Sequence, residues 1–499
     1  MSMKKSHGKI AKVGLALTLA LGLFSQSAFA AAPATQATQP AKTAYAIVNP
    51  YESVDWAAYG QYKADFHAHS TNSDGANLMK DMVEDHYAKG FDILAMTDHN
   101  HTTVAWDIPG YGRNVPGGSD LSVSGSLLTS ARVAEIFAGA GRGGKGMISL
   151  LNTNEQSNVD HINTFWADFN NTGSDNMASI IAKAQELGGI SHINHPGRYT
   201  GGANGNDAAS IAASNNPANV QKYVDLFKTY PSLVGMEIIN KIDNESKSDR
   251  ILWDNILKEM MPQGRFVWGF SNDDSHALDS TGYAWNVMLM PELTEEATRT
   301  AMETGAFYAV SRVSRLDGIN RYYPGTTTEV AGAGDASTLY LLEQKTPSIS
   351  NIVVNGSIIT ITGADYNSIE WIADGVVVAT GNSIDVSECA GINSYVRAQL
   401  KSATGIAFTQ PFGVVETTCE NVKVDASVKQ LNGNKNDLTI TVTETYVGFF
   451  GGQEIVSVVE TVKTFSINNN AAGTYEVGEY KVYVDTKGNT QIRECYIVK

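Results

Sequence analysis

The stretch KADFHAHST, residues 63–71, organises the rest of the chain. In an extended strand, residues two apart point to the same side, so His67 and His69 present both imidazoles to one face. Such a pair suits a metal ion, although two ordinary surface histidines would have the same spacing. The distribution of the other histidines favours a metal site. Apart from His7, all of them lie in one part of the chain, at positions 67, 69, 86, 99, 101, 161, 192, 195 and 276.

The composition indicates a folded protein of several domains. With 499 residues and 42% hydrophobic content, the chain is long enough for two or three packed domains. Its formal charge is −16, and removal of residues 1–30, which hold four lysines and no acid, lowers it to −20. Such a charge repels polyanions, so we expect no wrapping of nucleic acid. A small phosphate ester can still bind if cations screen the site.

The N-terminal residues have the pattern of a secretory signal peptide. Lysines precede an apolar run from Val13 to Phe24, and the small residues that follow predict cleavage after Ala30. A retained anchor is disfavoured because a membrane span needs about twenty apolar residues. We therefore expect a mature protein that is secreted or otherwise extracytoplasmic, at the cell surface or in the periplasm, without a transmembrane segment. Residues 31–60 are expected to form a flexible leader, since their first part is rich in Ala, Thr, Gln and Pro.

Residues 61–330 have the texture of an α/β domain. Apolar strand-like runs are expected at 63–67, 92–97, 147–151, 190–194, 234–239, 266–270, 285–290 and 306–310. Amphipathic helical patterns lie between several of them, at 77–89, 176–187, 218–229, 248–260 and 294–304. Repeated strand and helix units predict a parallel sheet, and this number of units favours a closed β/α barrel.

Most of the chemically distinctive residues lie at or just after the ends of these expected strands. In a β/α barrel, the carboxyl ends of the strands form the active face. The pattern therefore predicts that one rim of the barrel gathers His67, His69, Asp74, Asp98, His99, Glu155, His195, Asp274 and His276.

The remaining residues predict two small all-β domains of the Ig-like sandwich type, at 340–415 and 416–499, because short Val/Ile/Thr runs alternate there with Gly and Asn. We expect accessory domains, with a cell surface or an extracellular polymer as candidate partner. In an oxidising compartment, three cysteines predict one disulfide. Which pair forms stays open, although Cys419 with Cys495 would join both ends of one domain; the third thiol is Cys389.

Five motifs in order resemble the PHP (polymerase and histidinol phosphatase) family of metal-dependent phosphoesterases. They are DFHAHSTNSDG, MTDHN, a glutamate after the third expected strand, NHPGR and DDSH, and together they span residues 62–310. The resemblance implies a distorted (β/α)7 barrel with a trinuclear site of manganese, zinc or iron, so two to three divalent ions per chain.

The resemblance also implies how the ligands are shared. One ion would be held by His67, His69, Glu155 and Asp274, and a second by Asp74, His99 and His276. A third would be held by Glu155, His195 and a further histidine. That histidine is His161 or His192, and we favour His161 because His192 lies within an expected strand.

Other residues have weaker claims to a role. Arg198, directly after the HPG motif, could clamp a phosphate oxygen, Asp98 could orient a ligand histidine, and His101 could donate a proton to the leaving group. Arg198 and His101 could equally have no role, whereas the alternative for Asp98 is a direct metal ligand, which we disfavour. His86 is expected to be packed or exposed, and the family position that Glu237 matches is not generally a ligand. Asp273 is expected to be a hydrogen-bonding neighbour of Asp274. The long Gly- and Ser-rich insertion between the second and third expected strands, with Arg113, Arg132 and Arg142, could shape access to the site or be a plain surface loop.

The sequence thus predicts a secreted metal-dependent hydrolase, foremost a phosphoesterase that uses a metal-bridging hydroxide to cleave a small or terminal phosphate ester. Hydrolysis of a carbamate or carboxyl ester on the same metals is one alternative. A surface-binding protein with a vestigial barrel is another, although the intact ligand set argues against it.

Overall fold

The computed structural model describes residues 42–112, 122–158, 160–200, 208–243, 247–319, 343–431, 435–468, 472–487 and 491–498. The expected signal peptide, Arg113 and the expected domain boundary between 330 and 340 lie outside the described residues. No helix among the described residues combines the length and the apolarity needed to cross a bilayer.

The first part of the described chain alternates strands with helices, as its hydrophobic pattern predicted. Its elements are β1 (Thr43–Val48), β2 (Gly60–Ala68), α1 (Met79–Ala88), β3 (Ile93–Met96), β4 (His101–Thr102), β5 (Tyr111–Gly112), α2 (Ser130–Phe137), β6 (Ile148–Ser149), β7 (Asn154–Ser157), β8 (His161–Phe165), α3 (Met177–Glu186), β9 (Ile190–Ile193), α4 (Pro196–Tyr199), α5 (Ala208–Ser214), α6 (Pro217–Thr229), β10 (Leu233–Asn240), α7 (Lys247–Met260), β11 (Trp268–Asn272), β12 (Ala284–Met290), α8 (Glu295–Thr304) and β13 (Phe307–Ser311).

Helix ends follow local capping chemistry. The Asn176 side chain accepts from the backbone of Ser179 at the start of α3, and Ser179 reciprocates. At the start of α8 the Thr294 side chain accepts from the Ala297 N–H, and the helix ends at Gly305, whose φ of +77° suits a residue without Cβ. These signals explain why the sequence located most of the helices to within one or two residues.

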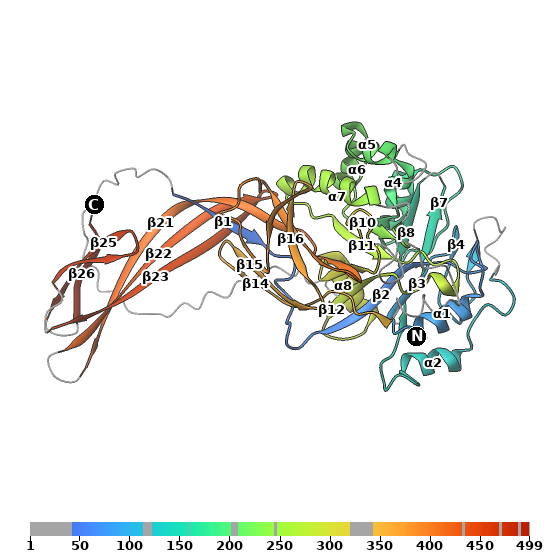
Figure 1. The fold of residues 1–499 in the computed structure, drawn as a ribbon, viewed down its shortest axis with the longest axis horizontal. Coiled ribbons are helices and arrows are strands. Elements are labelled where there is room, and N and C mark those ends of the chain that lie inside the picture. Colours follow the sequence, from blue (N-terminus) through green and yellow to red (C-terminus); the bar gives the residue numbers. More distant parts are fainter. Residues whose placement is uncertain are drawn as a thin grey trace, which may run out of the picture. The chain divides into compact units, whose positions relative to one another are not determined.

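The strands around the site form two sheets with several antiparallel pairs, which corrects the prediction of a parallel sheet; closure into a (β/α)7 barrel stays a prediction. One sheet contains the run β13-β12-β2-β3-β6 and the other has the order β11-β10-β9-β8-β7. Single bridges join them, between Ala68 and Ser275 and between His99 and Glu155. The pairs β7–β8 and β8–β9 are antiparallel, so the third crossover contains a hairpin that the sequence analysis missed. Helices α4 to α7 gather beside β10 and β11 (Figure 1).

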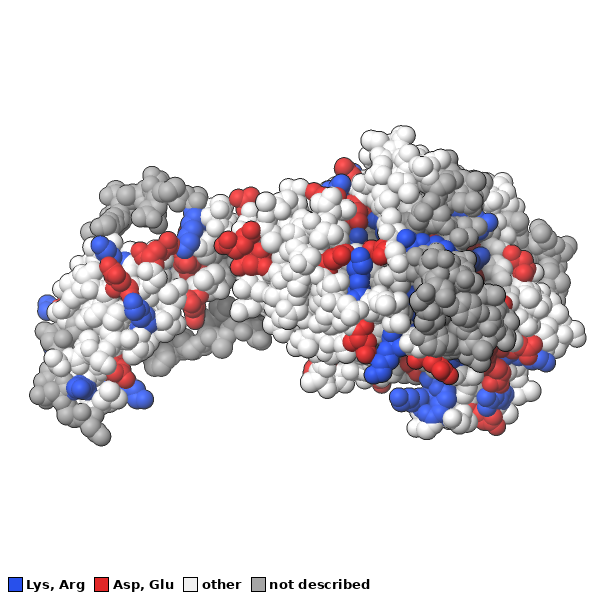
Figure 2. Space-filling model, in the orientation of Figure 1, with Lys and Arg blue, Asp and Glu red and all other residues white. Residues whose placement is uncertain are grey.

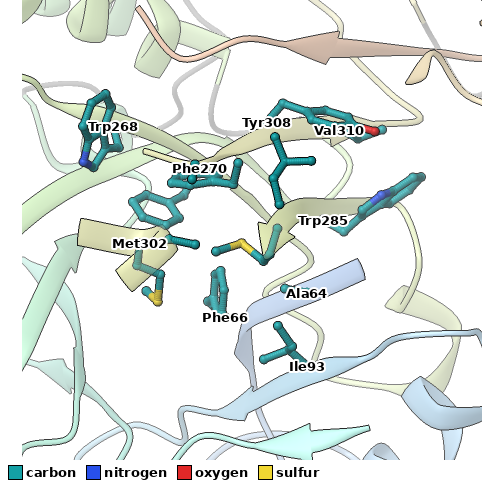
Figure 3. Close-up of a cluster of buried hydrophobic side chains, with 14 of the residues drawn as sticks. Ala64, Phe66, Ile93, Trp268, Phe270, Trp285, Met302, Tyr308 and Val310 are labelled. Carbon is teal, nitrogen blue, oxygen red and sulfur yellow. The ribbon is translucent and has the colours of Figure 1, made fainter. Parts of the chain in front are cut away.

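Alternation along β2 separates the hydrophobic core from the site. Ala64 and Phe66 face apolar side chains, while His67 points to the other side of the strand. The Phe66 ring meets the Phe270 ring of β11 edge-on, with centroids 6.1 Å apart. Figure 3 shows these rings with Tyr308 of β13 and Met302 of α8 around them. This packing fixes the strand that carries the first two histidines.

The described residues from 343 onward are almost entirely β-structure, as predicted. Their strands are β14 (Ser348–Asn355), β15 (Ile358–Ala364), β16 (Ser368–Ala373), β17 (Val376–Thr380), β18 (Ser383–Asp385), β19 (Tyr395–Ser402), β20 (Gly405–Phe408), β21 (Phe412–Gln430), β22 (Asn436–Phe450), β23 (Gln453–Ile467), β24 (Gly473–Val477), β25 (Tyr480–Lys487) and β26 (Gln491–Ile497).

The C-terminal strands are continuous with the first part of the chain, and this differs from the prediction of two separate sandwiches. β20 pairs with β13, so the sheet that contains β2 extends into β19, β21, β22 and β23. β1 pairs with β21 along its whole length, so part of the expected flexible leader is an ordered strand. One apolar cluster includes both Phe66 and Trp371. The expected domain limits themselves stay a prediction.

The expected disulfide is not formed, because the three thiols lie in different surroundings. All three cysteines are free. Cys389 packs against the main apolar cluster, and Cys495 packs against a separate one built by β22, β24 and β25. Cys419 lies in β21 opposite Tyr446.

Candidate metal centre

All nine side chains predicted as metal ligands lie close together. They come from the end of β2 and the turn after it, from the segments after β3 and β11, from the β7–β8 hairpin, and from the residue that precedes α4. Their donor atoms form four overlapping groups, each with all atoms within 4.8 Å of one another: His69, Asp74, His99 and His276; His67, His69 and Glu155; His67, His195 and Asp274; and His99, Glu155 and His161.

Glu155 is the centre of this cluster. Its carboxylate is fully buried and lies 2.6 Å from Nδ1 of His99 and 3.0 Å from Nδ1 of His161. Nε2 of His67 is 3.2 Å away, and the Asn194 amide donates to Oε1 at 2.7 Å. Because Glu155 lies within β7 rather than after a strand, the hairpin partner β8 can bring His161 to the same carboxylate.

Asp274 forms the second buried acidic point. Its Oδ1 lies 3.0 Å from Nε2 of His69 and 3.5 Å from Nε2 of His67. Its Oδ2 lies 3.2 Å from the Lys241 ammonium. The backbone of Asp274 has a φ of +44°, a conformation that costs a non-glycine residue free energy and is common at functional sites.

Asp74 lies on the open side of the cluster. Its side chain is 56% exposed, and it lies 3.3 Å from Nε2 of His276 and 3.6 Å from Nε2 of His99. The other carboxylates of the cluster, Glu155 and Asp274, are buried. Solvent and substrate can therefore reach the cluster from the side of Asp74.

The buried donor atoms fit divalent cations. Four of them make no hydrogen bond among the described residues, namely Nε2 of His67, Nε2 of His69, Oε2 of Glu155 and Oδ1 of Asp274. An unpaired buried polar atom is costly, so several that converge on one place call for a partner. Imidazole nitrogens together with carboxylate oxygens are the donor set that zinc, manganese and iron accept.

A layer of amide and carboxylate groups orients the donors. Glu237 of β10 is fully buried, and its Oε1 lies 2.8 Å from Nδ1 of His67. The same carboxylate accepts from the backbone N–H of His195 at 2.9 Å and from the Asn272 amide at 2.8 Å. Metal-bound histidines commonly donate their second N–H to such a carboxylate. Glu237 therefore contacts the His67 ring and holds the backbone of His195.

The three residues considered for catalytic roles lie around the cluster. The Asp98 carboxylate accepts from the Ser70 N–H and the Ser73 hydroxyl, both at 2.7 Å, so it holds the turn between His69 and Asp74 rather than a histidine ring. His101 is 3% exposed and belongs to none of the donor groups found among the described residues. Arg198 lies in α4, and its positive charge acts on Lys241.

The pKa values of the histidines in the cluster are shifted in opposite directions. Burial lowers the pKa of His69 to about 4, so its ring is neutral near pH 7. Burial also opposes charge on His99, but the carboxylates of Glu155 and Asp74 outweigh it and raise the pKa of His99 to about 10. Hydrogen bonds from His276 and His99 hold the pKa of Asp74 well below its usual range. A metal would therefore displace a proton from His99 but none from His69.

His192 and His86 lie apart from the cluster. The His192 ring stacks on Phe270 with centroids 4.8 Å apart, whereas His161 is beside Glu155 as preferred. His86 is buried, and its Nε2 lies 3.2 Å from Asp65. Asp273 accepts from the backbone N–H groups of three residues, Gly282, Tyr283 and Ala284, so it fixes the chain between β11 and β12; a hydrogen bond to Asp274 stays a prediction.

Sequence reasoning missed two polar side chains of the site. The Tyr199 hydroxyl lies 2.9 Å from Nε2 of His161, and the Lys241 ammonium contacts Asp274. Lys241 directly follows β10, so the rule that located the other residues at strand ends also applied to it. A protonated amine has no lone pair for a metal, so the donor pattern did not include it. No signal in the sequence pointed to Tyr199.

The insertion after β3 is anchored rather than loose in its described part. It contains α2, and Arg132 of that helix binds the Glu84 carboxylate with two hydrogen bonds of 2.6 and 2.8 Å. Arg142 donates to Asp92 at 2.9 Å. These contacts attach the described part of the insertion to α1 and to the start of β3.

No family model matches the chain. Among curated proteins, it is similar to the DNA polymerase/3'-5' exonuclease PolX of Bacillus subtilis (strain 168), with 43% identity over 49 residues. That match covers 10% of this chain and 9% of PolX, so it spans about a tenth of either protein.

Two solved structures are also similar. One is a two-domain protein containing a predicted PHP-like metal-dependent phosphoesterase from Bacteroides vulgatus ATCC 8482, with a TM-score of 0.36, 14% identity, and coverage of 82% of this chain and 96% of that one. The other is the lesion-specific endonuclease PfuEndoQ from Pyrococcus furiosus, with a TM-score of 0.28, 13% identity, and coverage of 49% of this chain and 56% of that one.

Proposed function

We propose that this chain, which resembles the PHP family, is a metal-dependent phosphoesterase that cleaves a small or terminal phosphate ester. One observation carries the proposal: nine histidine and carboxylate side chains converge, and four of their buried donor atoms make no hydrogen bond of good geometry among the described residues. Two or three divalent ions held there would neutralise charge on a phosphoryl group and activate water. Uncatalysed hydrolysis of phosphate monoesters is among the slowest reactions known, so such a site suits it.

The protein's own part is to hold and orient these donors. Glu237 would accept a hydrogen bond from Nδ1–H of His67, which would leave Nε2 available to a metal in the cluster. Asp98 holds the turn that carries His69 and Asp74. Arg198 lies three residues after His195 and is proposed to attract the substrate anion through its positive charge. The His101 ring is buried. Its role as proton donor to the leaving group stays a proposal.

The proposal extends to fold, location and partners. We propose that the two sheets around the cluster correspond to a distorted (β/α)7 barrel of the PHP type whose closure relies on single bridges. The leader sequence of residues 1–30 supports secretion, and mass spectrometry of the exported protein would test cleavage after Ala30. On the face that Figure 2 shows, acidic and basic side chains are interspersed, which supports a small substrate rather than a nucleic-acid duplex. Binding of an extracellular polymer by the C-terminal strands is proposed without a named ligand.

The test combines metal content with a panel of substrates. Protein purified without chelator should carry two to three equivalents of manganese, zinc or iron and should hydrolyse small chromogenic phosphate esters. Asp74→Ala removes an exposed donor without opening the core, so it should lower metal content and activity while the protein stays folded. Asp225→Ala, an exposed aspartate of α6, is the matched control and should change neither.

Two outcomes would contradict the proposal. Full activity after exhaustive chelation would exclude a metal-dependent reaction. Cleavage of neutral carboxyl or carbamate esters but not of phosphate esters would support the metal site and would replace the phosphoesterase hypothesis with that of a carboxyl or carbamate ester hydrolase.

A further inference from the structure

A cavity opens directly beside the donor cluster. It has a volume of about 320 Å³, and Asp274 and His276 form one part of its wall. The rest of the wall is formed by residues outside the donor groups: Lys241, Ile242, Asp279, Ser280 and Tyr283. Its volume lies at the lower end of the range for sites that take small molecules. A molecule in this cavity would therefore lie against two candidate metal ligands at once.

Lys241 supplies a positive charge at the point where the cavity meets the cluster. Its ammonium lies 3.2 Å from Oδ2 of Asp274, and its side chain is 40% exposed. Arg198 is close enough to act on that charge. An anion in the cavity would thus meet the Lys241 ammonium directly, beside the carboxylates of Asp274 and Asp279, with Arg198 outside the wall.

The backbone of Lys241 provides an independent observation. Its φ is +53°, the left-handed region in which a side chain costs free energy and glycine does not. Its N–H donates to the Asn272 carbonyl at 3.0 Å, so the conformation is held between the ends of β10 and β11. A glycine would satisfy the fold at this position with less strain. Strained side-chain positions of this kind cluster at ligand sites.

We propose that this cavity receives the phosphate group of a monoester and that Lys241 makes the chain select monoesters over diesters. The inference rests on the phosphoesterase proposal and deepens it. A monoester carries about two negative charges near neutral pH, which an ammonium and a guanidinium can match. A diester carries one negative charge and a second substituent in place of the oxygen that Lys241 would bind.

The experiment uses the metal-loaded full chain and two variants of the lysine. Lys241→Gly removes the ammonium and relieves the backbone, and Lys241→Met keeps most of the aliphatic stem. Lys228→Met, an exposed lysine of α6, is the control. The measurements are metal content, unfolding temperature, binding of inorganic phosphate by calorimetry, and KM and kcat for p-nitrophenyl phosphate and bis(p-nitrophenyl) phosphate.

We expect both Lys241 variants to keep their metal and their unfolding temperature and to bind inorganic phosphate roughly ten- to a hundredfold more weakly, as loss of a charge-assisted hydrogen bond predicts. KM for the monoester should rise by the same factor and KM for the diester by less than about twofold. Phosphate affinity within twofold of wild type would overturn the inference, and so would parallel loss of metal, because Lys241 would then only support Asp274. If wild type cleaves neither ester, the phosphoesterase proposal is refuted. The calorimetric comparison of phosphate binding still decides whether Lys241 binds phosphate in the cavity. Failure of wild type to bind phosphate would refute the cavity's proposed role.

Discussion

Removal of the Arg397 side chain should destabilise the whole described chain rather than its C-terminal strands alone. Arg397 of β19 donates to the Asp254 carboxylate of α7 through Nε at 2.8 Å and Nη2 at 2.7 Å. Tyr395 donates to the same carboxylate at 2.9 Å. Both charged side chains are at most 7% exposed. Breaking one partner out of a buried pair leaves an unpaired charge and costs about 3–5 kcal/mol.

Arg397→Leu should therefore lower the free energy of unfolding by about 3–5 kcal/mol. At about 2 °C per kcal/mol, a value for larger domains, the unfolding temperature should fall by roughly 6–10 °C. Addition of Asp254→Asn removes the buried charge, keeps an acceptor for Tyr395 and should recover part of the loss. Arg493→Leu is the control, because its pair with Asp485 is 3.7 Å long and Arg493 is 69% exposed, so it should cost about 0–1 kcal/mol.

The assay is calorimetric unfolding together with release of bound metal as temperature rises. Because α7 also packs on β10, loss of the pair should lower both transitions together. A cost below about 1 kcal/mol would refute the reasoning on burial. A separate early transition of the C-terminal strands, with metal release unchanged, would show instead that these strands form an independent domain, as the sequence suggested. The outcome thus also decides whether a truncation after the first part of the chain can fold.

Three further predictions concern single side chains. Burial lowers the pKa of Lys63 to about 8, whereas the lysine of the unfolded chain has a pKa of about 10.5. Between these pH values the unfolded state binds more protons, so the free energy of unfolding should rise with pH. Denaturant titrations of Lys63→Met should show no such rise. The Asp249 carboxylate accepts from the Gly197 N–H of the HPG motif and so holds the segment that carries His195. In a metal titration, Asp249→Ala should weaken metal affinity roughly tenfold, whereas Asp249→Asn, which keeps an acceptor, should not. Equal effects of the two variants would contradict this positioning role of Asp249. Chain purified without reductant and then unfolded should react with three equivalents of a thiol reagent, and a single equivalent would indicate a disulfide between two of the residues Cys389, Cys419 and Cys495.

Residues with distinctive chemistry and strongly periodic segments were predictable from the sequence. The strand that carries His67 and His69 is β2, and the expected helix at 77–89 is α1. Histidine and aspartate at strand ends are rare enough that their positions alone indicated one common site. Their assembly around Glu155 and Asp274 follows from strands that run side by side. Which of them bind which ion stays a prediction.

Hydrophobic periodicity did not predict the strands whose buried side chains are polar. β7 and β8 have the sequences NEQS and HINTF, and neither shows the alternation of a half-buried strand, because both bury polar side chains that serve the cluster. The antiparallel hairpin was therefore missed, although Glu155 and His161 on it were identified. Hydrophobic periodicity reports burial of apolar groups and says nothing about a strand whose buried groups are donors.

The sequence by itself determined the donor set, most of the helices and the β-rich character of the C-terminal region, because these depend on residue type and on local spacing. Only the tertiary structure decided that β1 pairs with β21, that β13 pairs with β20, and that Arg397 meets Asp254. It also placed Lys241 beside Asp274. These contacts join residues far apart in the chain, and their energies depend on burial and charge pairing that appear only once the chain has folded.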